Sequence, residues 1–131
     1  MENLTSAKKI QALEDSCNKV LQLPKIRFVG VLDNMGNKIA GGFKKEIVSY
    51  LPDKDNRQMY VQLVLEYLMR KDFDDALGSI DYITSRRGKI TMISVPTREY
   101  LVLITAERDA NIEEIIHKVN TSFTMLPDIV P

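Results

Sequence analysis

The chain has 131 residues, close to the commonest size of a single domain, with 44% hydrophobic and 27% charged residues and a formal net charge of zero. Zero net charge gives no general argument for binding nucleic acid or an anionic membrane, and a single cysteine excludes an internal disulfide. Residues 1–11 lack the apolar stretch that is typical of a signal peptide, and no apolar run approaches the roughly 20 residues of a membrane helix. We therefore expect one cytoplasmic domain, residues 1–131, with no membrane insertion and no nucleic-acid partner.

The first predicted elements are an amphipathic helix and a strand. Apolar side chains recur at steps of three and four over residues 5–22, where Thr5 or Ser6 can cap the start and Pro24 prevents continuation. Residues 26–32 are rich in β-branched and aromatic side chains, which predicts a β-strand.

The stretch FVGVLDNMGNKIAGG, residues 28–42, raises the question of a phosphate-binding glycine loop. Such a loop requires Lys and then Ser or Thr after its last glycine, whereas Gly41 is followed by another glycine and a phenylalanine. The same residues suit a β-hairpin, because Asn and Gly tolerate positive φ and Asp bonds its own nearby backbone. We predict a hairpin whose turn is shaped by Asp33 and Gly36.

The second predicted helix has an unusually wide apolar surface. Asp55 can cap it, with a glutamine three residues later in a capping-box arrangement. Polar side chains recur at steps of four, at Gln58, Gln62, Glu66 and Arg70, and nearly every residue between them is apolar. The apolar arc is about twice the roughly 100° of an ordinary surface helix. We therefore expect burial on two sides, against the helix's own sheet and against a second subunit.

Beyond Arg70 the helical phase changes, which predicts a kink or a new turn that ends at Gly78. Three acidic side chains gather there: Asp72, Asp74 and Asp75. They could hold a hard cation, but the full ligand pattern of a calcium loop is missing. Arg70 and Lys71 precede two of the carboxylates by four residues, so ion pairs along a helix are the favoured explanation.

Residues 79–106 predict three strands in an antiparallel meander, because short turns divide them into three runs. The last run is apolar on both faces, as is typical of a central strand covered on both sides. Residues 110–120 carry an apolar stripe behind an Asp or Asn cap, which predicts a final helix, and residues 121–131 form a C-terminal tail.

Few side chains indicate a catalytic, metal-binding or anion-binding site. Arg86, Arg87 and Lys89 flank a tight turn and could contact an anion or an acidic partner, although a solvated hairpin tip is the commoner arrangement. His117 is the only histidine and Cys17 lies on an apolar stripe, so neither a zinc site nor a catalytic Cys–His pair is indicated. We expect no enzyme activity, no metal and no cofactor.

The predicted order of helix, two strands, helix, three strands and helix indicates an α+β fold, a three-layer sandwich around a five-stranded antiparallel sheet. This order, the turn in GVLDNMGNKIA and the long apolar second helix resemble the roadblock/LC7 family of the profilin-like and longin-like group, over about residues 4–120. The segment RQMYVQL…MRKDFDDALG is also similar to small uncharacterised archaeal proteins, a likeness that implies no function.

Roadblock-like domains are typically non-catalytic, pair through the second helix and the strand after it, and serve small GTPases or larger scaffolds. The resemblance therefore implies a homodimeric signalling or scaffolding module, with a small GTPase as a further partner. It places the dimer interface at Tyr60, Val64, Tyr67, Leu68, Ile80 and Tyr82.

An alternative interpretation is a small-molecule sensor, because PAS-like and longin-like sheets can hold a ligand between sheet and helix. Met92, Tyr100 and Phe43 could line such a cavity.

Overall fold

The computed structural model describes residues 2–123. Its elements are α1 (Glu2–Leu21), β1 (Ile26–Leu32), β2 (Lys38–Phe43), α2 (Asp53–Arg70), the 3₁₀ turn η1 (Lys71–Phe73), α3 (Asp74–Leu77), β3 (Ile83–Arg86), β4 (Ile90–Pro96), β5 (Leu101–Glu107) and α4 (Ile112–Phe123). This confirms the predicted order, with η1 and α3 as an extension of the second helix. Within the same range, no helix is both long and apolar enough to cross a membrane.

The five strands form one antiparallel sheet in the spatial order β2–β1–β5–β4–β3. Every residue of β1 is buried, and so is every residue of β5 except the last. A strand that is apolar on both faces needs a covering layer on each side, so these inner strands require helices on both faces of the sheet. Strand β3 lies at an edge and pairs only with β4.

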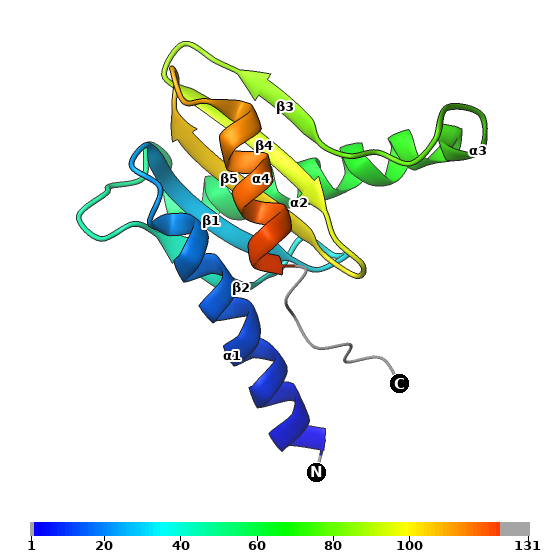
Figure 1. Ribbon diagram of the computed structural model, residues 1–131, viewed down its shortest axis with the longest axis horizontal. Helices are drawn as coiled ribbons and strands as arrows, with labels where there is room; N and C mark the ends of the chain where they lie inside the picture. Colours follow the sequence, from blue (N-terminus) through cyan, green and yellow to red (C-terminus); the bar gives the residue numbers. More distant parts are fainter. Residues whose placement is uncertain (1, 124–131) are drawn as a thin grey trace.

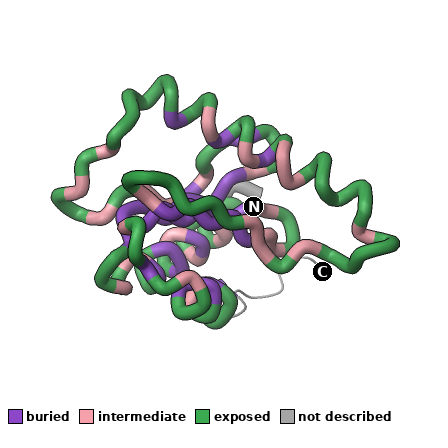
Figure 2. The backbone as a smooth tube through the Cα atoms, turned by 90° about the horizontal axis from the view of Figure 1, so that it is seen from above, coloured by how far each residue is buried: buried purple, intermediate pink, exposed green. Residues whose placement is uncertain are grey.

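Helices cover the two faces unequally (Figure 1). α1 and α4 lie together on one face, where 17 buried side chains form the larger core cluster. α2 alone lies on the other face, where the second cluster has seven buried side chains, among them Phe28, Tyr60 and Leu103. In Figure 2 the buried positions gather in the middle of the molecule. The predicted three-layer α+β sandwich is therefore confirmed, but one outer layer is a single helix.

Two helices begin earlier than the predicted caps. α1 starts before Thr5 and Ser6, so both lie within the helix rather than at its cap. α2 starts two residues before Asp55, directly after Pro52, and no side chain caps it. Pro52 is itself the N-cap residue, with extended backbone, and its carbonyl accepts from the backbone N–H groups of Asp55 and Asn56, both at 3.0 Å, so α2 begins there without the predicted capping box.

The chain after α2 follows the predicted kink and stop. η1 and α3 follow Arg70, and Gly78 ends them with a φ of 89°, which glycine adopts without strain. The next strand is shorter than predicted, because residues 79–82 form no strand pairing. α4 begins behind an Asn111 cap, as predicted, and continues to Phe123. The rest of the predicted C-terminal tail lies outside the described residues.

The turn between β1 and β2 is built around Asp33. Its carboxylate accepts hydrogen bonds from the backbone N–H groups of Met35 and Asn37, both at 2.9 Å. Partial burial of the carboxyl opposes its ionisation, but these donors outweigh burial and hold the pKa of Asp33 below its ordinary value. In the structure this glycine-containing stretch forms the hairpin between β1 and β2, and the Asp33 carboxylate bonds the backbone of its turn.

The same turn packs on α2 through Gly36. Its φ is 84°, and a Cβ at this position would lie 2.7 Å from the Cα atom of Val61. Only a residue without a side chain allows the hairpin to approach the helix backbone so closely. The glycine thus fixes the distance between the hairpin and α2.

Gly36→Ala should lower the free energy of unfolding by about 2 kcal/mol or more, because positive φ and the clash with α2 act together. Gly42→Ala is the matched control, since a Cβ at Gly42 meets nothing within 4 Å. We expect the control to lie within about 0.5 kcal/mol of the unsubstituted chain in urea unfolding. Equal effects of the two substitutions would show that the hairpin does not press on the helix.

Candidate functional site

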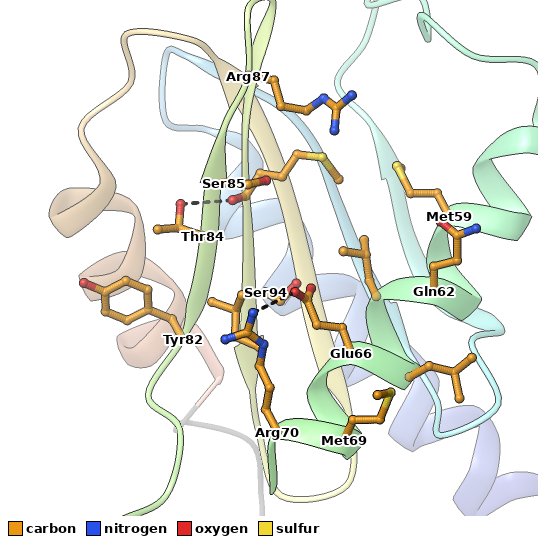
Figure 3. A pocket seen from close by; sticks show the side chains of 14 residues that line it. Met59, Gln62, Glu66, Met69, Arg70, Tyr82, Thr84, Ser85, Arg87 and Ser94 are labelled. Carbon is orange, nitrogen blue, oxygen red and sulfur yellow. Dashed lines mark hydrogen bonds and ion pairs between the residues drawn. The ribbon is translucent and has the colours of Figure 1, made fainter. Parts of the chain in front are cut away.

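A groove runs between α2 and the edge strand β3 (Figure 3). Its volume is about 1030 Å³. One wall is α2 from Met59 to Arg70, and the other follows the chain from Tyr82 to Arg87. Side chains of β4 form the floor. The groove is larger than a second hollow at the N-terminal end of α2, whose volume is about 550 Å³.

Pairing between β3 and β4 decides which side chains face this groove. Ile83 lies opposite Ser94, and Ser85 lies opposite Met92. Paired residues share a face of the sheet, and all four of these line the groove. Sequence alone does not single out Ile83 or Ser85, because the alternation of side chains along β3 cannot say which of its faces meets α2.

The α2 wall is mostly apolar but carries one internal ion pair. Met59 and Leu63 are half-buried against the smaller core cluster, whereas Met69 is 68% exposed. Arg70 Nη2 donates to Glu66 Oε2 at 3.3 Å, one helical turn away. The predicted polar stripe thus reaches the groove, where its charges neutralise each other.

Further apolar side chains of α2 remain exposed, Leu65 among them in the wall of the groove. Val61, Leu65 and Leu68 are each between 40% and 52% exposed. The sheet therefore covers only one side of the helix, as the wide apolar arc predicts.

The six predicted interface residues occupy different surroundings. Tyr60 and Val64 face the sheet and are buried, and the Tyr60 ring stacks on Phe28 with centroids 5.8 Å apart. Burial raises the pKa of Tyr60, and the nearby charge of Asp53 adds to this. A second chain therefore has little of these two side chains to contact.

The other four predicted residues are more accessible. Tyr67 is half-buried and Leu68 exposed, while Ile80 precedes the paired part of β3. The Tyr82 ring points away from α2 (Figure 3), and its hydroxyl lies 3.2 Å from Glu113 Oε1 of α4. This hydrogen bond raises the pKa of Tyr82. The role of the six residues in a dimer stays a prediction.

A smaller cleft lies at the N-terminal end of α2. Its volume is about 550 Å³, and it is bounded by the first turns of α2, by Tyr50 and Leu51, and by the turn between β3 and β4. Arg27 holds the Tyr50 side of the cleft in place. Its Nη2 donates to the Val48 carbonyl at 2.9 Å, and its guanidinium lies 4.3 Å from the centroid of the Tyr50 ring.

The predicted basic cluster is divided between the two faces of the sheet. Arg86 Nη2 donates to the Ala110 carbonyl at 3.0 Å, so this side chain serves the fold on the α4 face. Arg87 lies on the groove side, and Lys89 Nζ lies 5.3 Å from the centroid of the Tyr50 ring. Contact with a partner stays a prediction, and only Arg87 and Lys89 are placed on the α2 face.

The predicted ion pairs of the acidic segment are wrong. Arg70 pairs with Glu66, and Lys71 Nζ lies 5.6 Å from the centroid of the Tyr67 ring rather than beside an aspartate. The reason is η1, because a 3₁₀ turn between the basic and acidic residues removes the spacing that brings residues four apart together. Over residues 2–123, no group of three acidic, His or Cys side chains could hold a metal ion.

The structure also separates the residues of the predicted sensor cavity. Met92 belongs to the core cluster beneath α2, and Phe43 contacts Phe28 of the same cluster with ring centroids 4.9 Å apart. Tyr100 packs against the cluster on the opposite face of the sheet. The cysteine shows no sign of reactivity, because burial raises the pKa of the Cys17 thiol to about 12.

Comparison with known proteins identifies the family of the chain. A family model, described as a family of unknown function (DUF6659), matches residues 6–125. The chain belongs to this family. A search of curated proteins found no match.

Solved structures share the fold at low sequence identity. The gliding protein MglB from Thermus thermophilus is 10% identical, with a TM-score of 0.75 over 92% of this chain and 90% of its own. A roadblock/LC7 domain from Streptomyces avermitilis is 9% identical, with a TM-score of 0.66 over 85% and 91%. MglC from Myxococcus xanthus is 12% identical, with a TM-score of 0.58 over 85% and 92%. This DUF6659 chain therefore has a roadblock/LC7-like fold.

Arg27→Met should loosen the segment 44–51, because it keeps an apolar stem but removes the hydrogen bond to Val48, the cation–π contact with Tyr50 and the 3.4 Å ion pair with Glu107. We expect faster amide hydrogen exchange in that segment and a loss of about 1–3 kcal/mol of stability. Lys25→Met is the control, since it removes only the exposed ion pair with Asp109, whose Nζ–Oδ2 distance is 2.7 Å. Unchanged exchange in Arg27→Met would show that other contacts hold the segment.

Proposed function

We propose that this chain is a non-catalytic regulatory module that acts as a homodimer, joined through the groove between α2 and β3. The proposal is based on three features that lie at one place and that a single chain leaves uncovered or unpaired. These are the open groove, the exposed apolar side chains of α2 and the unpaired outer edge of β3. A second copy would supply an apolar helix and a pairing strand together.

The direction of the two walls supports a symmetric arrangement. Met69 and Arg70 lie at the same end of the groove as Tyr82, whereas Met59 lies toward Arg87 (Figure 3). α2 therefore runs antiparallel to β3. A two-fold axis at the middle of β3 would pair that strand with its copy and set the two α2 helices antiparallel beside each other.

Met69→Glu should raise the dissociation constant of the dimer by about 100-fold or more, because an unpaired carboxylate would be buried in the interface. Light scattering over a concentration series measures this. Met35→Glu is the matched control, because Met35 is 71% exposed on the hairpin turn and lines neither the groove nor the cleft. A monomeric unsubstituted chain at micromolar concentration would overturn the proposal, and so would an unchanged Met69→Glu dimer.

A small GTPase is the further partner that the resemblance to roadblock domains favours. Purified small GTPases of the source organism, loaded with GDP or with a GTP analogue, should bind the dimer more tightly in one nucleotide state. Isothermal titration calorimetry measures the difference, with the Met69→Glu variant showing whether dimerisation is required. Equal or absent binding in both nucleotide states would contradict this part of the proposal.

A further inference from the structure

The arm, residues 71–78, projects from the end of α2 beyond the sheet (Figure 1). Phe73 is 63% exposed and Leu77 is 82% exposed, so the arm presents two large apolar side chains to solvent. Its three aspartate carboxylates form no ion pair or side-chain hydrogen bond with another described residue. An exposed segment that combines apolar and acidic side chains in this way fits a surface with apolar and basic side chains.

The cleft at the other end of α2 has that complementary character. Leu51, Met59 and Ile90 supply apolar surface. Arg87 and Lys89 also line it, together with one carboxylate, that of Asp55. The Arg87 guanidinium makes no side-chain hydrogen bond with another described residue, and the Lys89 amine lies over the Tyr50 ring, 5.3 Å from its centroid.

The arm cannot reach the cleft of its own chain. α2 lines the cleft only as far as Gln62, so at 1.5 Å per residue about 12 Å of helix separates the cleft from Arg70, and the arm continues from there away from the cleft (Figure 1). In a pair of antiparallel α2 helices, however, the C-terminal end of one helix lies beside the N-terminal end of the other. The arm of each copy would then lie next to the cleft of its partner.

We propose that, in the homodimer, the arm of each copy docks into the cleft of the second copy. The inference rests on the proposed function. Phe73 and Leu77 enter the apolar part of the cleft, and the three aspartates face Arg87 and Lys89. The groove and the cleft share Met59 and Arg87 among their lining residues, so the arm continues the same interface without a gap.

Cross-linking of two single-cysteine variants tests the docking. Leu77→Cys marks the arm, and Gly88→Cys marks the cleft, where a Cβ meets nothing within 4 Å. The native Cys17 is buried with a pKa of about 12 and does not compete for a maleimide at neutral pH. After the two variants are mixed and allowed to exchange subunits, a short bis-maleimide should give a covalent dimer at least tenfold faster than with either variant alone.

Asn120→Cys on the exposed side of α4 replaces the cleft variant in the control, and we expect its mixture with Leu77→Cys to stay at the background rate. A chain that dimerises by light scattering but cross-links equally in both mixtures would overturn the docking and leave the proposed dimer intact. A monomeric chain would overturn both.

Reversal of charge gives an independent measurement on the same dimer. Arg87→Glu with Lys89→Glu should raise the dimer dissociation constant on the order of tenfold, because attraction becomes repulsion at two symmetric places. Adding Asp74→Lys and Asp75→Lys should restore it to within about threefold. Lys8→Glu with Lys19→Glu, on exposed positions of α1, makes the same change in net charge and should have no effect. Failure of the aspartate changes to restore affinity would contradict the docking.

Discussion

The burial of β1 and β5 on both faces is the constraint on which the rest of the structure depends. Because neither face of these strands can meet water, the chain must provide a helical layer on each side of the sheet. α1 and α4 complete one layer, whereas α2 alone begins the other. The groove beside α2 is the part of that second layer that a single chain leaves unfilled, and this is why the candidate site lies there.

The position of α2 is fixed mainly at its N-terminal half. Gly36 brings the hairpin against Val61, and the buried Asn56 donates from its side chain to Ser49 Oγ at 2.9 Å. Arg27 ties down the segment that precedes the helix. The described contacts of the arm provide nothing comparable. The N-terminal end of α2 is thus held by several contacts and carries the cleft, while the C-terminal end extends past the sheet.

Sequence patterns predicted the elements well and the site only in part. Helical periodicity predicted the long helices, residue type and turn signals predicted the strands, and the wide apolar arc of α2 indicated a second covered side. Alternation in SIDYITSR defines two faces of β3, but only the pairing of Ser85 with Met92 shows which face meets α2. For the same reason, the sequence could not predict that Tyr82 and Arg86 lie on the α4 face. The ion pairs of Arg70 and Lys71 were mispredicted because a 3₁₀ turn cannot be seen in helical spacing.

Charge is distributed differently along the two parts of the proposed interface. In the groove, Arg70 already pairs with Glu66 on the same helix, so covering that wall buries no unpaired charge. In the arm and the cleft, the aspartates and Arg87 have no side-chain partners within the described chain. Apolar contact in the groove therefore supplies affinity in any orientation of two helices, whereas only the antiparallel orientation brings the acidic arm to the basic cleft. The charged ends would thus select the orientation that also pairs the β3 edges.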